Sequence, residues 1–304
     1  MIKKLILNIS IVAVVVFVLD FAIGRTLRYF YFKETSGQHF RTTCSMETTE
    51  ADLLVFGSSR ANHHYVPEIF EDSLKTTFYN AGRDGNGILF QTAVLKSVLT
   101  RYFPKVIILD AGGFNKEKDN YDRLSSLLPY YRTHKEIRSI IELKSPFEKI
   151  KLLSQIYPFN SQIIAIATGN LDFFARSKPD NKGYVALHGE WPAEISYNDA
   201  YSAYEVDANK IFALREFINI AKKSGAKIFV IYSPVFLKFK KNLDIEVGND
   251  VCSFENVPYW DFSRDTQFLS NRHLFQDRSH LNHKGATIFS KLIVTKIKQG
   301  ILVN

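Results

Sequence analysis

The chain has 304 residues, of which 46% are hydrophobic, 23% charged and 14% aromatic. This length suits one α/β-sized folding unit with insertions, and the composition excludes a disordered, collagen-like or low-complexity chain. Lysine and arginine total 39 against 31 acidic residues, which gives a net charge of +8. The basic residues are scattered and do not interleave with stacking aromatics, so we expect no nucleic acid partner and favour a surface suited to anionic lipid.

The first predicted element is a membrane-spanning helix. Residues 5–23 read LILNISIVAVVVFVLDFAI, and as a helix they would cover about 28 Å, close to the thickness of a bilayer's hydrocarbon core. Lysines precede this run, and an aromatic cluster at 29–32 follows it, where lipid headgroups would lie. We therefore expect residues 1–32 to form a cytoplasmic tip, a retained signal anchor and its interface. A cleaved signal peptide is the alternative, because residues 22–24 resemble a cleavage site.

The rest of the chain alternates short apolar runs with amphipathic stretches. Residues 33–51 are polar and are expected to form a stalk, and residues 52–304 a single catalytic domain. The alternation predicts a three-layer α/β/α fold with a central parallel sheet. Residues 116–204 are too long for one crossover and are expected to form an inserted, mostly helical lid. The predicted strands are 52–56, 77–80, 105–109, 227–232 and 257–260, and the predicted helices are 87–103, 206–224 and 282–298.

Residues that follow the first three strands are candidates for a site, since ligands bind beyond the carboxyl ends of parallel strands. Ser59 follows the first strand at a sharp turn, where its hydroxyl would be exposed and its N–H could stabilise negative charge. A simple helix cap is the other interpretation. Gly82 and Gly85 follow the second strand and allow close approach of the backbone to a substrate. Asn115 follows the third, and its amide could donate to an oxyanion.

An acidic residue and a histidine stand just before the last predicted helix. Asp277 could orient the imidazole of His280 and stabilise its charged form, as a general base for a serine requires. The bare pattern also arises by chance in loops. No metal or cofactor is expected, because the other histidines lack carboxylates at ligand spacing, and Cys44 and Cys252 are too distant for a redox motif. Those two cysteines could pair in an oxidising envelope or remain thiols.

Taken in order, four segments resemble the four blocks of the SGNH/GDSL hydrolase superfamily. They are GSS at 57–59, Gly85, GFN at 113–115 and DRSH at 277–280. The resemblance implies that Ser59 is the nucleophile, His280 the general base and Asp277 its orienting partner. It also implies an oxyanion hole made by the Ser59 and Gly85 N–H groups and the Asn115 amide.

Two positions depart from the family pattern, and the assignment of the second-block glycine stays open between two residues. Ser58 replaces the Asp of Gly-Asp-Ser, and Lys116 replaces the Asp after the third-block Asn. Neither change removes a group that would make or break bonds. Gly82 competes with Gly85 for the second-block role.

The GSS form, the anchor and the HLN sequence at 280–282 are similar to a membrane-anchored branch of the superfamily, the D-alanyl transfer protein of teichoic-acid modification and the alginate O-acetyltransferases. The branch implies an extracytoplasmic serine esterase acting on acylated envelope carbohydrate or another ester, anchored in the bilayer through residues 5–23. A multispanning acyl-donor membrane protein is an implied partner. The alternatives are an O-acyltransferase and a catalytically silent envelope binding protein.

Overall fold

The protein is represented by a computed structural model that describes residues 1–116, 121–170, 180–194, 196–198, 205–239 and 241–302. The chain divides into two compact units. The helical unit comprises residues 1–40 and 124–179, and the sheet unit comprises residues 41–123 and 180–304. Each is described by itself.

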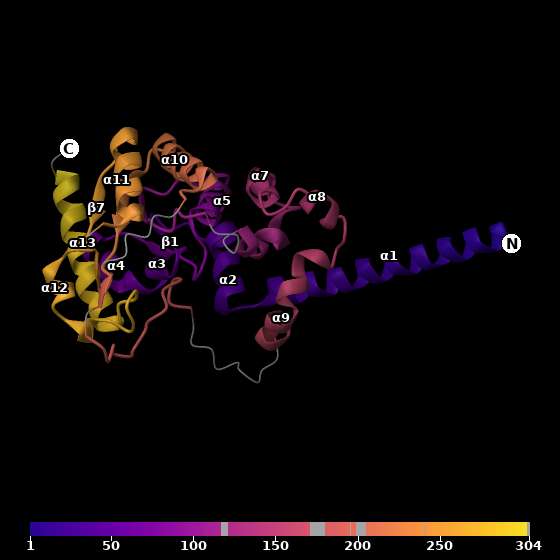
Figure 1. Cartoon of the computed structure of the whole chain (residues 1–304), viewed down its shortest axis with the longest axis horizontal. Coiled ribbons are helices and arrows are strands. Elements are labelled where there is room, and N and C mark those ends of the chain that lie inside the picture. Colours follow the sequence, from indigo (N-terminus) through magenta and orange to yellow (C-terminus); the bar gives the residue numbers. More distant parts are fainter. Residues whose placement is uncertain (117–120, 171–179, 195, 199–204, 240, 303–304) are drawn as a thin grey trace. The chain divides into compact units, whose positions relative to one another are not determined.

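The sheet unit is built on a five-stranded sheet in which all neighbouring strands are parallel (Figure 1). Each predicted strand is present, with its ends shifted by at most two residues. The strand order places β3 at the centre with β1 and β5 on either side, so the carboxyl ends of β1 and β3 are adjacent. In sheet order the strands are β2 (Phe78–Asn80), β1 (Leu53–Gly57), β3 (Val106–Asp110), β5 (Lys227–Tyr232) and β7 (Tyr259–Asp261).

Helices cover both faces of this sheet because side chains of a strand alternate between faces. Val55 belongs to the core cluster shared with α3, α4 and α13, whereas the next residue, Phe56, has its ring 5.3 Å from that of Phe217 on α10. The predicted three-layer α/β/α fold is confirmed. One layer contains α3 (Ser59–His64), α4 (Pro67–Leu74) and α13 (His283–Leu302), and the other α5 (Ile88–Leu99), α10 (Ala208–Lys223) and α11 (Leu243–Glu255).

Several shorter elements were not expected from the sequence. The segment expected as a stalk is largely helical, and Met46 within it is fully buried, with its carbonyl accepting a hydrogen bond of 2.8 Å from Arg101 Nε. The mostly polar composition of residues 33–51 gave no sign of this burial. The additional elements are α2 (Gly37–Thr43), a π-helical turn η1 (Cys44–Thr48), a two-stranded parallel sheet of β4 (Ser196–Asn198) and β6 (Leu237–Phe239), α12 (Thr266–Leu269) and η6 (Arg272–Leu274).

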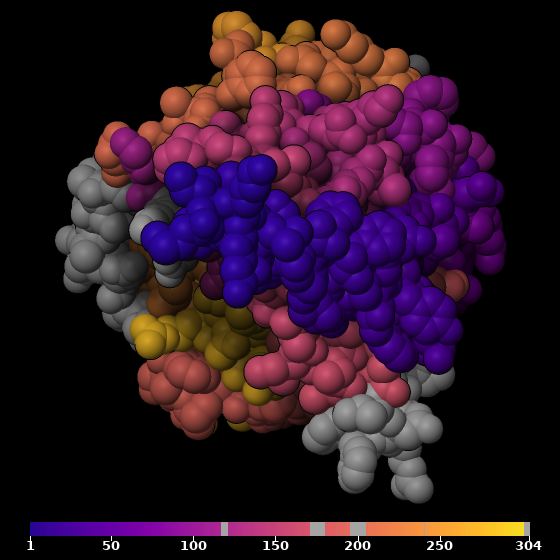
Figure 2. Space-filling model, turned by 90° about the vertical axis from the view of Figure 1, so that its right-hand side faces the viewer, coloured from indigo at the N-terminus to yellow at the C-terminus, as the bar shows by residue number. Residues whose placement is uncertain are grey.

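The helical unit combines the N-terminal helix α1 (Ile2–Lys33) with much of the predicted insertion. In the part of the chain that the structure describes, α1 is the one helix long and apolar enough to cross a membrane. Figure 2 shows α1 in indigo with magenta and pink segments of the insertion on both sides of it. The insertion contributes η2 (Arg123–Tyr130), η3 (Lys135–Ile137), α7 (Arg138–Glu142), α8 (Glu148–Lys151), η4 (Tyr157–Gln162) and α9 (Ile163–Asn170).

Parts of the predicted lid belong to different units. Its first described helices group with α1, whereas Tyr184 and Trp191 pack on the core of the sheet unit. Residues 117–120, 171–179 and 199–204 of the predicted lid lie outside the described residues.

Candidate active site

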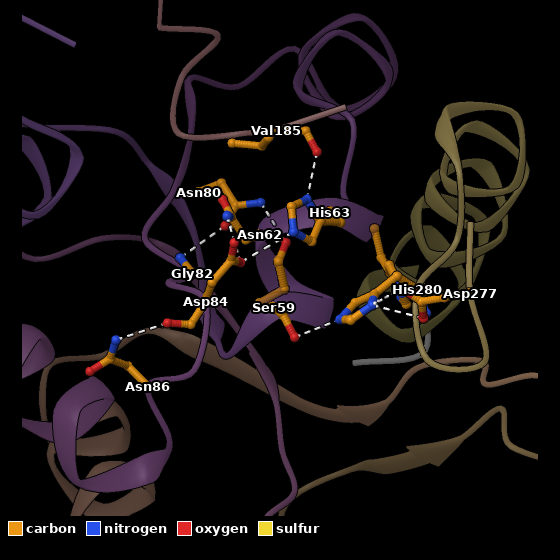
Figure 3. Close-up of polar contacts among 12 residues, drawn as sticks. Ser59, Asn62, His63, Asn80, Gly82, Asp84, Asn86, Val185, Asp277 and His280 are labelled. Carbon is orange, nitrogen blue, oxygen red and sulfur yellow. Dashed lines mark hydrogen bonds and ion pairs between the residues drawn. The ribbon is translucent and has the colours of Figure 1, made fainter. Parts of the chain in front are cut away.

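Three side chains from opposite ends of the sheet unit's sequence form one hydrogen-bonded chain (Figure 3). Ser59 Oγ lies 2.7 Å from His280 Nε2, and His280 Nδ1 lies 2.8 Å from Asp277 Oδ2. A carboxylate only accepts, so His280 Nδ1–H donates to Asp277; in the neutral imidazole, Nε2 is then the acceptor for the Ser59 hydroxyl. The structure thus brings together the three residues that the sequence suggested, in the order hydroxyl, imidazole, carboxylate.

The position of Ser59 follows from the turn between β1 and α3. Gly57 ends the strand with a φ of +145°, and a Cβ there would lie 2.6 Å from the carbonyl oxygen of Asp110. Glycine is therefore required for this close approach of β1 and β3. Ser58 is the N-cap of α3 and Ser59 its first residue, so the Ser59 N–H is among those that have no acceptor inside the helix.

Asp277 is held as a carboxylate by the turn on which it lies. Its Oδ1 accepts hydrogen bonds from the N–H groups of Ser279 at 2.7 Å and His280 at 3.0 Å. Partial burial acts to raise the pKa of Asp277, but hydrogen bonds from the His280 ring and these two N–H groups lower it below the ordinary value. The side chain that orients His280 therefore stays ionised across the neutral range.

Two adjacent histidines on α3, to which the sequence assigned no role, lie beside His280. His64 is fully buried; its Nε2 accepts from the Leu281 N–H at 2.9 Å, and its Nδ1–H donates to Ser233 Oγ at 3.0 Å. Burial lowers the pKa of His64 well below its usual value, and the nearby His280 adds to this effect. His64 is therefore neutral and fixes the backbone just after His280.

His63 has the opposite electrostatic character. Its Nδ1–H donates to the Val185 carbonyl at 2.7 Å, its Nε2 lies 3.2 Å from Asp84 Oδ1, and its ring centroid is 5.5 Å from that of His280 (Figure 3). Burial acts to lower the pKa of His63, but Asp84 and the Val185 carbonyl raise it. The sequence could not reveal this pair, because Asp84 is 21 positions away in a different loop.

We expect the contribution of His63 to stability to depend on pH. Its pKa is raised in the folded chain, so its stabilising effect is complete below the unfolded pKa, about 6.5, and disappears as the pH rises through the folded value. His63→Gln should thus cost most stability in mildly acidic solution and progressively less at higher pH. Denaturant unfolding of both proteins at a series of pH values measures this difference.

His64→Gln is the matched control, with the opposite trend. The pKa of His64 is lowered in the folded chain, so wild-type protein loses stability when the unfolded chain takes up a proton below about pH 6.5. The cost of His64→Gln should therefore shrink as the pH falls. A pH-independent cost for His63→Gln would contradict the ion pair with Asp84.

A cavity of about 400 Å³ lies beside Ser59 and His280, at the carboxyl ends of the central strands. Two glycines after β3 and two glycines after β2 form part of its wall, so backbone as well as side chains borders the cavity. The wall also carries two guanidinium groups. The lining residues relevant here are Ser59, Arg60, Gly85, Gly112, Gly113, Arg123 and His280.

Asn115 does not occupy the place expected for it. It is not among the described residues that line the cavity; instead it forms an isolated antiparallel bridge with Val206, and its carbonyl oxygen accepts from Lys210 Nζ. The chain turns at Gly113, with a φ of +75°, and then runs beside the segment that leads into α10. The expected contribution of the Asn115 amide to an oxyanion hole is therefore not supported, because backbone pairing directs this residue elsewhere.

Gly82 and Gly85 are the two candidates for the second-block glycine. Gly85 lies at the cavity, whereas Gly82 lies beneath α3. The Gly82 N–H already donates to Asn80 Oδ1 at 2.9 Å, and a Cβ there would lie 2.7 Å from the Asn62 nitrogen. Gly85 has a φ of +70°, and a Cβ on it would lie 1.9 Å from Arg123 Nη1. The glycine at 85 thus lets the Arg123 guanidinium lie against the backbone at the edge of the cavity.

Neither a metal site nor a disulfide is found among the described residues. Among the described residues, no group of three or more His, Cys, Asp or Glu side chains is arranged to hold a metal ion. Cys44 and Cys252 are free thiols, and burial raises the pKa of Cys252 to about 12.

Comparisons with known proteins give only distant structural likenesses. No family model matches the chain, and no curated protein matches it. A solved structure of the psychrotrophic esterase EstA from Pseudoalteromonas sp., inhibited by monoethylphosphonate, is similar with a TM-score of 0.43 and 10% identity, covering 82% of this chain and 97% of that one. A structure of TesA is similar with a TM-score of 0.39 and 12% identity, covering 80% and 96%. At these scores the likeness assigns no activity to this chain.

Proposed function

We propose that this protein is a serine esterase of the SGNH/GDSL type. The observation that carries the proposal is the hydrogen-bonded chain from Ser59 through His280 to Asp277, placed at a cavity large enough for a small acyl ester. A hydroxyl that donates to a neutral imidazole, itself oriented by an ionised carboxylate, is the arrangement that activates serine as a nucleophile.

The reaction begins when Ser59 Oγ attacks the ester carbonyl carbon. The Ser59 proton passes to His280 Nε2, and the imidazolium is stabilised by Asp277. As the tetrahedral intermediate collapses, its bond to the leaving alcohol breaks, and His280 returns the proton to that alcohol. Water, deprotonated by His280, then attacks the acyl-serine, and the carboxylic acid and free Ser59 are released.

Negative charge on the carbonyl oxygen of the intermediate needs donors close to Ser59. The N–H groups of Ser59, at the start of α3, and of Gly85, in the cavity wall, are the donors we assign. Arg123 lies against Gly85 and lines the same cavity, so its guanidinium adds positive charge to the cavity wall.

The exposed apolar helix α1 supports a retained membrane anchor. We place the sheet unit outside the cytoplasm, with acyl groups on cell-envelope carbohydrate as its substrate, because the sequence resembles the membrane-anchored branch of the superfamily. Sequencing the N-terminus of protein extracted from membranes should give the intact residues 1–32. A soluble mature chain that starts near Arg25 would instead show a cleaved signal peptide.

Ester turnover tests the activity and the identity of the acceptor. Purified full-length protein should release the chromophore from a chromogenic acetyl ester in water alone. If an oligosaccharide acceptor takes the acyl group in preference to water, the protein is an O-acyltransferase, and a multispanning membrane protein is the acyl donor that we propose for it. Absence of turnover on acetyl, propionyl and aminoacyl esters would favour a silent envelope binding protein.

A further inference from the structure

Asp20, an acidic residue inside the apolar run of α1, is hydrogen-bonded to a turn of the insertion in the helical unit. Its carboxylate accepts hydrogen bonds from the N–H groups of Gln155 at 2.7 Å and Ile156 at 3.3 Å, and from the hydroxyl of Ser154. Arg132 donates to the carbonyl of Leu152 at 2.8 Å from the other side of the same turn. The polar backbone of this turn therefore has partners for both its donors and its acceptors.

One turn further along α1, Gly24 lies on the same face as Asp20. A Cβ at this position would lie 2.3 Å from Gln155 Cβ and 2.4 Å from the Gln155 carbonyl carbon. The helix backbone and the turn are thus in direct contact. Asp20 and Gly24 together fix the height of the turn along α1.

If α1 spans the bilayer, the position along α1 at which the turn binds lies within the bilayer. The apolar run starts at Leu5, and a hydrocarbon core of about 30 Å at about 1.5 Å per residue ends near residue 24. Asp20 would then lie about 6 Å inside the outer boundary of the core. Backbone at this depth must have its hydrogen bonds satisfied by protein, and an intramembrane carboxylate must be paired. The contacts of the turn at 152–156 meet both conditions.

Large apolar side chains are exposed next to this turn. Phe147 is 62% exposed, Ile150 65% and Leu153 76%, and on α9 Ile164 is 81% exposed. Within the helical unit, α8 lies on one side of α1 and α9 on the other (Figures 1 and 2). Apolar side chains therefore flank α1 on both sides close to its outer end, where solvent exposure would be unfavourable.

We propose that the insertion is a second membrane contact, in which Phe147, Ile150, Leu153 and Ile164 enter the same leaflet as the outer end of α1. The occupant of these apolar side chains is lipid, because they flank the exposed apolar run of α1 (Figure 1) and the turn beside them is held at its depth by Asp20 and Gly24. The inference rests on the proposed anchoring by α1 and assigns the insertion a role in holding the enzyme at the membrane surface.

Site-directed fluorescence in full-length protein tests this contact. In a Cys44→Ser/Cys252→Ala background, single cysteines replace Ile150, Leu153 or Ile164 and carry an environment-sensitive dye. Each protein is reconstituted into vesicles of zwitterionic and anionic lipid, with or without nitroxide-labelled acyl chains. We expect blue-shifted emission at all three positions and strong quenching by the nitroxide lipid.

Two matched labels make the outcomes distinguishable. A label at Val14, 61% exposed on α1, should be quenched if α1 spans the bilayer, and a label at Phe212, 68% exposed in the sheet unit, should not. Loss of quenching at Val14 would overturn the proposed anchoring. Quenching at Val14 without quenching at positions 150, 153 and 164 would overturn the second contact alone and indicate that protein covers this surface. Ester turnover of each labelled variant confirms that it is folded.

Discussion

Ser59→Ala is expected to abolish covalent labelling by a fluorophosphonate probe and to lower ester turnover about 10⁴-fold or more, to the background rate. The reason is geometric: Ser59 Oγ is the oxygen that lies 2.7 Å from His280 Nε2. Without it the imidazole has no hydroxyl to deprotonate, and no acyl-enzyme can form. Gel fluorescence of the labelled protein and release of a chromogenic alcohol measure the two effects.

Ser58→Ala is the matched control, since Ser58 lies one position earlier in the same turn. It is the N-cap of α3 but makes no side-chain capping hydrogen bond, so its removal should keep most labelling and turnover, with a stability cost of about 1 kcal/mol at most. His280→Ala should lose labelling although Ser59 is intact, because the probe reacts only with an activated hydroxyl. Labelling that persists in Ser59→Ala would show that the nucleophile is a different residue.

The part of the site that could be predicted from sequence is the part set by local patterns. Apolar runs marked the strands, and the rule that parallel strands present their carboxyl ends together linked Ser59 to the remote Asp277–His280 turn. The spacing of Asp277 and His280 was itself informative, because a single tight turn holds residues three positions apart within contact. Each of these signals is weak alone, and it is the ordered resemblance of the four segments to the superfamily that assigned roles to Ser59, Asp277 and His280.

The remaining features depend on contacts that no local pattern encodes. Asn115 follows a strand in the expected way, but pairing of its backbone with Val206 directs it away from the cavity. Arg123 belongs to no expected motif, although it lies only eight residues after Asn115, and its guanidinium lies against residue 85 because a glycine there leaves room for it. Asp20 is an acidic residue within the expected membrane span, and its partners, at 154–156, lie more than 130 positions away.

A buried ion pair supports the cavity from behind Ser59. Asp110, at the end of β3, is 4% exposed; its Oδ2 accepts from the Tyr65 hydroxyl at 3.0 Å, and its Oδ1 lies 3.3 Å from Arg60 Nη2. Arg60 also donates to the Ala111 carbonyl at 2.9 Å, and its guanidinium carbon lies 4.0 Å from the centre of the Tyr232 ring. Burial raises the pKa of Asp110, and Arg60 is the charge that most opposes this rise.

Arg60→Leu is therefore expected to destabilise the sheet unit by about 3–5 kcal/mol, the usual cost of leaving one partner of a buried pair without its opposite charge. The loss should be greatest at neutral and alkaline pH. Without Arg60 the pKa of Asp110 rises further above its unfolded value, so the folded variant binds a proton more tightly than the unfolded chain and gains stability as the pH falls. Denaturant unfolding followed by tryptophan fluorescence measures this unit, because both tryptophans lie in it.

The double variant Arg60→Leu/Asp110→Asn separates loss of the charge pair from loss of packing. An amide at position 110 can still accept from the Tyr65 hydroxyl but carries no charge, so this variant should recover much of the stability that Arg60→Leu loses and show no matching dependence on pH. If the two variants were equally unstable at every pH, the cost would come from the lost contact of Arg60 with Tyr232 and the Ala111 carbonyl. Recovery in the double variant would instead show that Arg60 is needed chiefly because Asp110 is buried as a carboxylate at the carboxyl end of β3, next to the turn that presents Ser59.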